Sequence, residues 1–312
     1  MPDTTTSWVL SEGLAGLQTQ ALGLAEAAGL TPDVRVLRPR APWRYLPAKL
    51  WPKPLAAVSR TVTAPLPQIA IGCGGMAAAV LAALRGRGGS VVQVQHPRMD
   101  TSRYDLIVVN RHDELTGPNV IVTRNALHRV TPERLAAEGE KWRDHFAPYR
   151  RPLVAVLVGG SNGRHRLGQA EGAKLAAELA EMMRRDNVGV VVTPSRRTDP
   201  AVTRMLHEAL TPLGGWVWDF TGENPYFGML ALADAIIVTM DSVSMVSEAA
   251  ATAAPILLYP LPGWSRRINL FHQGMIADGR VRLFQGRYEP WMVAPLDDTR
   301  TAAAEMRRRL GF

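Results

Sequence analysis

Hydroxyl and carboxylate side chains gather after a short apolar segment, residues 235–239, where a segment rich in helix-forming residues begins. They are Asp241, Ser242, Ser244, Ser247 and Glu248. Amide groups in the first turn of a helix favour phosphate, and a carboxylate one turn further on can accept hydrogen bonds from ribose hydroxyls. The pattern indicates a nucleotide site. It is also typical of an ordinary helix start, in which a serine caps the turn and Glu248 is a solvated acid that suits the helix dipole.

The elements around these residues form a β-loop-α-β unit. Residues 235–239 and 256–259 are apolar enough for buried strands, and residues 245–254 predict a helix that Pro255 ends. Such units belong to parallel sheets, whose ligands bind at the carboxyl ends of the strands.

Two further turns follow predicted strands in the same half of the chain. Residues 159–164 are rich in glycine and follow strand 153–158, and residues 195–198 follow strand 189–193. For a diphosphate we expect contacts from Gly160, Ser161, Arg196 and the 242–244 turn. The sequence contains no P-loop lysine and no carboxylates at obvious metal spacing, so we expect amide and arginine stabilisation without a metal.

The first half repeats this plan with candidate bases. Glycine-bearing turns follow strands 7–10 and 68–71, but their spacing does not match the dinucleotide fingerprint, so nicotinamide and flavin are not expected. Strands 90–94 and 106–109 are followed by His96 and His112. We expect His96 as the base, with Glu12 and His112 next.

The chain is therefore predicted to be an α/β protein with two Rossmann-like parallel-sheet domains facing across a cleft. We place the first domain at 1–150 and the second at 151–312, and the turns of the second fit a mononucleotide diphosphate better than a dinucleotide. The intervening 124–151 segment is expected to be a basic linker helix.

Composition limits the classes of partner. The 312 residues carry a formal charge of +8, are 46% hydrophobic and include one cysteine, Cys73. A single cysteine excludes an intramolecular disulfide and fits a reducing cytoplasm. No apolar run approaches a membrane span, and the first residues do not resemble a secretory signal. The positive charge favours an anionic partner, but nucleic acid is not expected, because no RNA-binding aromatic motif or zinc finger is present.

Residues 39–67 are rich in proline, tryptophan and basic side chains, and they predict an excursion from the regular fold. Trp43 and Trp51 beside arginine and lysine suit a lipid–water interface, which would make the protein peripheral on the cytoplasmic face of a membrane. The alternative is a loop whose tryptophans cover the core of its own domain.

Several motifs resemble the Elm-type mitochondrial-fission family. They are the 239–249 segment, Asn224-Pro225-Tyr226, the 117–120 and 127–132 segments, and the glycine turn at 159–162. The resemblance covers nearly the whole chain and implies a glycosyltransferase of the GT-B type. The basic, arginine-rich composition without a recognisable organelle transit signal indicates a bacterial member. A looser similarity to lipid II-forming N-acetylglucosaminyltransferases implies that the glycine turn approaches the donor diphosphate and that Glu248 holds the ribose.

The resemblance implies a nucleotide-diphosphate sugar as donor, bound by the 151–312 nucleotide-sugar-binding domain, with 1–150 as the acceptor-side domain and no tightly bound cofactor. Together with the cationic 39–60 excursion it predicts a lipid-linked or cell-envelope molecule as acceptor. The expected donor-site residues are Gly159, Gly160, Ser161, Asn162, Ser195, Arg196, Asn224, Asp241, Ser242, Ser244, Met245, Ser247 and Glu248.

A second hypothesis is a membrane-associated binding or scaffold protein on the same frame, without catalysis. The fission association of the plant relatives favours it. The 11–16 turn also lacks the arginine of the family's usual acidic-Gly-Arg-Ala-Gly opening. The donor, the acceptor, the stereochemistry of transfer and the oligomeric state stay open at this point.

Overall fold

The computed structural model describes residues 5–312, and their contacts divide into two units. The first unit extends to Arg129 and includes Asp297–Phe312, whereas the second is Val130–Leu296. This division differs from the expected boundary at residue 150. Helix α4 (Pro132–Phe146) packs on α7 (Tyr226–Leu232) in the second unit, and α10 (Asp298–Leu310) returns to the first.

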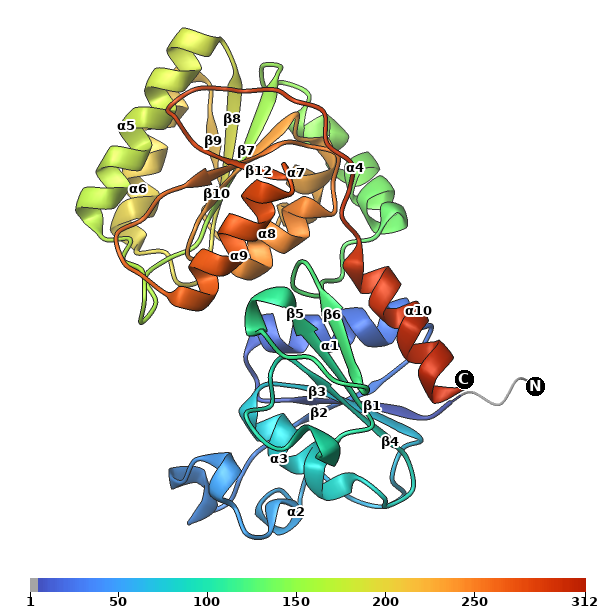
Figure 1. Ribbon diagram of the computed structural model, residues 1–312. Helices are drawn as coiled ribbons and strands as arrows, with labels where there is room; N and C mark the ends of the chain where they lie inside the picture. The colour runs from blue at the N-terminus through green and yellow to red at the C-terminus, as the bar shows by residue number, and fades with distance from the viewer. Residues whose placement is uncertain (1–4) are drawn as a thin grey trace. The chain divides into compact units, whose positions relative to one another are not determined.

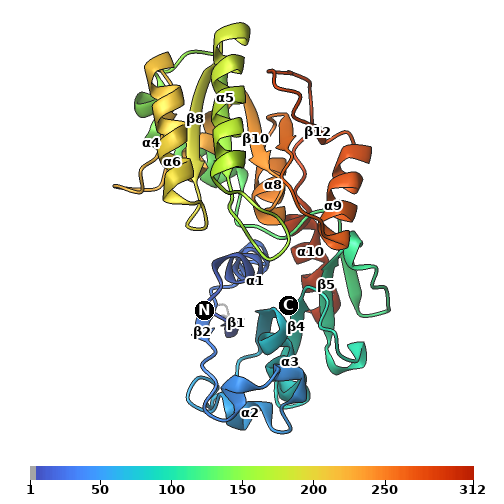
Figure 2. The same cartoon turned by 90° about the vertical axis from the view of Figure 1, so that its left-hand side faces the viewer.

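A six-stranded parallel sheet forms the first unit, in the order β2-β1-β3-β4-β5-β6 (Figure 1). Its strands are β1 (Ser7–Ser11), β2 (Asp33–Val36), β3 (Ile69–Cys73), β4 (Ser90–Val94), β5 (Leu106–Asn110) and β6 (Val120–Thr123). Helices α1 (Ala15–Ala27) and α10 pack on one face, and α2 (Pro54–Ala57) and α3 (Gly75–Leu84) pack on the other (Figure 2). Both faces of strands β1 and β3–β5 are buried, which explains their mainly apolar sequences, whereas the edge strand β2 is mostly exposed.

The second unit has the same architecture, with strand order β12-β11-β10-β7-β8-β9. Its strands are β7 (Leu153–Val158), β8 (Gly189–Pro194), β9 (Trp216–Val217), β10 (Ala235–Thr239), β11 (Ile256–Tyr259) and β12 (Val281–Leu283). Helices α5 (Gln169–Asp186) and α6 (Pro200–Leu210) cover one face. Helices α4, α7, α8 (Val243–Ala250) and α9 (Arg266–Ala277) cover the other (Figure 1). The prediction of two Rossmann-like parallel-sheet domains is confirmed.

Three expected elements differ from those in the structure. The strand expected at 216–220 stops at Val217, because the Asp219 carboxylate accepts the Thr221 amide at 2.9 Å and turns the chain. The helix expected at 245–254 ends at Ala250. Strand β12 was not expected, because Val281 is the one buried residue of its three and gives no apolar run.

Helix α10 is held on the first unit by an ion pair across a long sequence separation. Asp298, at its first turn, accepts the Arg124 backbone amide at 2.5 Å and pairs with the Arg124 guanidinium. The Thr299 hydroxyl accepts the His128 amide at 3.0 Å. These contacts explain why the end of the chain belongs with its beginning.

The excursion at 39–67 contains three short helices: α2, η1 (Trp43–Tyr45) and η2 (Ala48–Leu50). Trp51 is 6% exposed, and its indole N–H donates to the carbonyls of Trp43 and Leu46 at 3.0 and 3.1 Å. Trp43 is partly buried against the same core. The structure therefore agrees with the core-covering alternative. The prediction that Trp51 contacts a membrane is wrong, because its side chain is buried in its own domain. In residues 5–312, no helix is both long and apolar enough to cross a bilayer.

Candidate functional site

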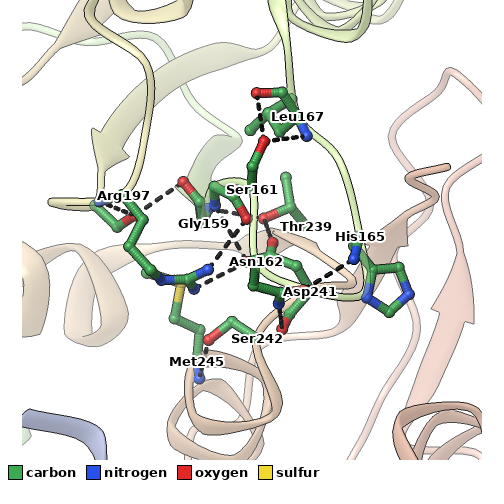
Figure 3. Close-up of polar contacts among 12 residues, drawn as sticks. Gly159, Ser161, Asn162, His165, Leu167, Arg197, Thr239, Asp241, Ser242 and Met245 are labelled. Carbon is green, nitrogen blue, oxygen red and sulfur yellow. Dashed lines mark hydrogen bonds and ion pairs between the residues drawn. The ribbon is translucent and has the colours of Figure 1, made fainter. Parts of the chain in front are cut away.

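The carboxyl ends of β7, β8 and β10 meet at one edge of the second sheet, and the polar residues that follow them are bonded together (Figure 3). Asp241 is at the centre, with a fully buried side chain. Its carboxylate accepts the Gly160 amide at 3.1 Å, the Thr239 hydroxyl at 2.7 Å and Nη2 of Arg197 at 2.9 Å. Asp241 therefore links the three strand ends and faces into the protein.

The glycine pair at the end of β7 is required by close packing. A Cβ on Gly159 would lie 2.2 Å from the Asp241 carboxylate, and one on Gly160 would lie 2.1 Å from the Arg197 carbonyl oxygen. The Gly159 amide donates to the Thr239 hydroxyl at 2.8 Å. Both amides are thus bonded within the protein, and a diphosphate contact with the Gly160 amide would have to replace its bond to Asp241.

Ser161 and Asn162 close the loop that follows. The Ser161 hydroxyl accepts the Leu167 amide at 3.0 Å, and the Asn162 side-chain oxygen accepts the amides of Arg164 and His165 at 2.9 and 2.8 Å (Figure 3). The Asn162 side-chain nitrogen donates to the Asp241 carbonyl. These two residues brace the loop, so their hydrogen-bonding groups are already occupied.

The turn after β8 divides its residues between inward and outward roles. The Ser195 hydroxyl donates to the Gly159 carbonyl at 2.8 Å, and the buried Thr198 hydroxyl donates to the Val158 carbonyl at 3.2 Å. Arg196 is exposed, and no carboxylate in residues 5–312 pairs with it. Arg196 thus stays available to an anion, while Arg197, absent from our expected set, holds Asp241.

Helix α8 begins with two amides that the fold does not use. The Ser242 hydroxyl accepts the Met245 amide at 3.3 Å, and the Ser242 carbonyl accepts the Val246 amide. Within residues 5–312 the amides of Val243 and Ser244 have no bonded acceptor. Such groups form the positive end of the helix dipole and favour a phosphate. The 242–244 turn therefore leaves two amides available to an anion.

Ser247 and Glu248 lie one turn further along α8. The Ser247 hydroxyl donates to the Val243 carbonyl at 2.8 Å, inside the helix. Glu248 is half-buried and accepts a hydrogen bond from the Tyr226 hydroxyl. Asn224 is exposed, and its side-chain oxygen caps the Tyr226 amide at 3.0 Å. The Asn224-Pro225-Tyr226 motif thus presents a phenol to Glu248, and Tyr226 is a site residue absent from our expected set.

Desolvation dominates the chemistry of this pair. Burial raises the pKa of Glu248 to about 7, opposed by the Tyr226 hydrogen bond and the Arg134 charge. Burial and the Glu248 charge raise the pKa of Tyr226 well above its ordinary value. The Arg134 guanidinium lies 3.6 Å from the Phe227 ring centroid. Glu248 is therefore a carboxyl group whose charge changes near neutral pH.

The candidate bases lie at strand ends of the first unit. Glu12 accepts the Met76 amide at 2.6 Å and so binds the start of α3. His112 is buried. His96 is half-exposed, and its Nδ1 accepts the Arg98 amide at 2.9 Å, so the neutral ring carries its proton on Nε2 and its basic lone pair is on Nδ1. Of the two histidines, His96 is the more accessible, and it could act as a base only with Nδ1 released from the Arg98 amide.

Two other kinds of chemistry receive no support from the side chains. Cys73 is buried, and desolvation with the charges of Glu12 and Asp113 raises the pKa of its thiol far above the ordinary value, so it is a core residue. Across residues 5–312 no three His, Cys, Asp or Glu side chains are grouped as metal ligands.

Comparison with solved structures shows the fold. The chain matches a UDP-GlcNAc 2-epimerase from Methanocaldococcus jannaschii with a TM-score of 0.60 at 11% identity, covering 97% of this chain and 98% of that one. MurG from Acinetobacter baumannii gives 0.53 at 16% identity (98% and 94%). A Neisseria meningitidis UDP-GlcNAc 2-epimerase bound to UDP-GlcNAc gives 0.54 at 13% identity (97% and 90%). The fold is therefore the GT-B type, as predicted.

Sequence comparison shows the family. The chain is 30% identical over 274 residues to the mitochondrial fission protein ELM1 of Arabidopsis thaliana, covering 78% of this chain. It spans 64% of the length of that relative. The family model described as mitochondrial fission ELM1 matches residues 15–310. The chain therefore belongs to the mitochondrial fission ELM1 family.

Proposed function

We propose that the second unit binds a nucleoside-diphosphate sugar and that the protein transfers the sugar to an acceptor hydroxyl. The observation that carries the proposal is Glu248, held by Tyr226 one turn beyond the two unused amides of α8. In this arrangement the amides of Val243 and Ser244 bind the diphosphate, Arg196 screens its charge, and Glu248 accepts hydrogen bonds from the ribose.

The transfer step needs one base and a stabilised leaving group. The acceptor oxygen attacks the anomeric carbon as the bond from that carbon to the donor diphosphate breaks, and Nδ1 of His96 takes the acceptor proton in place of its hydrogen bond from the Arg98 amide. Negative charge develops on the leaving diphosphate, where helix-start amides and an arginine stabilise it.

Two of the similar folds support a nucleotide sugar as donor, because one is named as an enzyme of UDP-GlcNAc and another is bound to UDP-GlcNAc. For the acceptor we propose a lipid-linked or cell-envelope molecule, reached by a protein that is cytoplasmic or peripheral on the inner face of the membrane. The motive is the cationic excursion at 39–60, which exposes Arg40, Arg44, Lys49 and Lys53.

A non-catalytic binding protein is the second candidate. The name of the Arabidopsis relative favours it, and so does Glu12, whose carboxylate binds the start of α3 instead of standing free as a base. A protein of this kind would bind the nucleotide sugar in the second unit and leave it intact.

Turnover separates the two candidates. The purified chain is incubated with nucleotide sugars and a bacterial lipid extract, and nucleoside-diphosphate release is measured. For an enzyme we expect His96→Ala to lower turnover by about 10²- to 10⁴-fold, because a general base contributes that much, with donor affinity unchanged. The exposed His207 of the second unit gives a matched control, His207→Ala, which keeps wild-type turnover. Donor binding without any release would establish the binding protein and overturn the transferase.

A further inference from the structure

An arginine-lined hollow of about 710 Å³ lies along the edge strand β2 of the first unit. Its lining includes Arg35, Arg38, Arg40, Arg44 and Arg60. The volume falls within the range of small-molecule sites. No aspartate or glutamate is among the lining residues, so the hollow presents positive charge alone.

One of the five arginines has a structural role. Arg35 pairs with Asp33 at 2.6 Å, donates to the Thr61 carbonyl at 3.4 Å and stacks over the Trp8 ring at 4.6 Å. These contacts fix its guanidinium and neutralise part of its charge. Arg35 therefore forms the wall between strand β2 and the segment around Thr61.

The other four arginines keep their charge. Arg38, Arg40, Arg44 and Arg60 are exposed, and none of them pairs with a carboxylate anywhere in residues 5–312. Two of them are oriented by neutral groups: Arg40 donates to the Ala56 carbonyl at 3.4 Å, and Arg44 stacks on the ring of the next residue at 4.6 Å. Four like charges around one hollow repel one another, and an anion between them relieves that repulsion.

A phosphate group is the anion that suits this lining. Guanidinium groups bind phosphate oxygens with two parallel hydrogen bonds, and a hollow with walls of one charge concentrates the field inside it. We propose that this hollow binds a phosphate-bearing ligand. The site lies within the first unit, and the proposal does not depend on the transferase function.

The phosphate could belong to a soluble molecule or to a lipid headgroup. The short helices beside Arg44 carry large apolar side chains in water: Tyr45 is 70% exposed and Leu50 is 61% exposed, with the exposed Lys49 between them in sequence. Such a rim suits a headgroup, whereas the hollow itself suits either source. The experiment therefore has one arm for each.

The soluble arm measures pyrophosphate binding by isothermal titration at low salt. We expect Arg38→Gln with Arg60→Gln to weaken binding at least about tenfold, because charge-assisted hydrogen bonds to phosphate are lost. Arg38→Lys with Arg60→Lys keeps the charge, and its affinity for pyrophosphate should lie between those of the wild type and the double glutamine variant. The matched control is Arg87→Gln with Arg103→Gln, two exposed arginines of the same unit outside the hollow, which should change affinity less than about twofold.

The lipid arm measures flotation with phosphatidylglycerol vesicles and with phosphatidylcholine vesicles. In this arm the hollow variant is Arg38→Gln with Arg60→Gln, and the control is Arg87→Gln with Arg103→Gln. If the hollow variant no longer binds the anionic vesicles and the control still does, the phosphate belongs to a lipid headgroup. Pyrophosphate binding with the same dependence, and no flotation, identifies a soluble phosphate. If neither pyrophosphate nor anionic vesicles distinguish the hollow variant from its control, while circular dichroism shows both folded, the proposal is overturned.

Discussion

Arg280→Met is expected to destabilise the second unit by about 4 kcal/mol. Arg280 is 5% exposed, and its guanidinium donates to the carbonyls of Ala249, Ala250, Thr252 and Ala254 at 2.7–3.2 Å. Burial lowers its pKa to about 10, so it stays charged at neutral pH. Methionine fills similar space but leaves the buried Thr252 and Ala254 carbonyls without donors, at about 1–3 kcal/mol each before relaxation, whereas the Ala249 and Ala250 carbonyls keep the amides of Thr252 and Leu296.

The same contacts explain why α8 ends at Ala250. The last carbonyls of a helix carry partial negative charge, and a buried cation satisfies them. Urea unfolding followed by circular dichroism measures the loss. The control is Arg282→Met, two residues further along the chain in β12, whose exposed side chain pairs with Glu289 at 3.8 Å and should contribute less than about 1 kcal/mol. A change within about 1 kcal/mol for Arg280→Met would contradict this account of α8.

The second large effect is expected from Asp241→Ala, which should cost about 3–5 kcal/mol and abolish tight nucleotide binding. The change leaves the Gly160 amide, the Thr239 hydroxyl and the Arg197 guanidinium without their shared acceptor. Asp241 is fully buried whereas the Arg197 side chain is 44% exposed, so most of the loss comes from the two buried donors left without an acceptor, at about 1–3 kcal/mol each. The 159–162 loop would then lose its position beside the α8 start.

A matched control exists at the start of α6. Asp199 is exposed and caps the Ala201 amide at 2.8 Å, so Asp199→Ala should lose about 1 kcal/mol and keep nucleotide affinity. Chemical unfolding and a nucleotide titration are measured on both variants. Equal stability losses, or nucleotide affinity retained in Asp241→Ala, would show that Asp241 does not organise the site.

Much of the fold could be predicted from apolar runs. Strands β7 and β10 match the predicted ranges, since a strand buried on both faces has a continuous apolar sequence. Helix α10 also matches, because its polar and apolar residues alternate with helical period. Its place in the first unit could not be predicted, because it depends on Arg124 and Asp298, which are 174 residues apart.

The convergence of the strand-end turns could be predicted from the sequence, whereas the contacts of their side chains could not. The strand-end turns do converge, but Gly159 and Asp241 face the protein interior. Of two adjacent exposed arginines, Arg197 pairs with Asp241 and Arg196 pairs with no carboxylate in residues 5–312, and sequence alone does not distinguish them. That difference depends on the shape of the 195–198 turn. Tyr226 belongs to the Asn224-Pro225-Tyr226 motif, but its contact with Glu248 could not be predicted, because the two residues are 22 positions apart.

The most direct test of the account is the pH dependence of nucleotide-sugar binding. Ribose hydroxyls donate to the ionised carboxylate, so binding requires Glu248 to lose its proton. With the pKa of Glu248 raised to about 7, roughly a tenth of the sites are ionised at pH 6 and roughly nine-tenths at pH 8. The stability of the unliganded protein changes with pH in the opposite direction. Because the pKa of Glu248 is raised in the folded state, the folded protein binds this proton more tightly than the unfolded chain does. That stabilisation is lost as pH rises toward 7, and the melting temperature of the unliganded protein falls.

UDP-sugar affinity should therefore increase about tenfold from pH 6 to pH 8, measured by isothermal titration, whereas NAD should not bind. A UDP-sugar is used because its esterified diphosphate does not titrate in this range. Glu248→Gln should bind more weakly and without the pH dependence. Tyr226→Phe removes a hydrogen bond that lowers the pKa of Glu248, so its profile should move to higher pH. No nucleotide-sugar binding at millimolar concentration, or equal affinity and pH dependence in wild type and Glu248→Gln, would contradict the account.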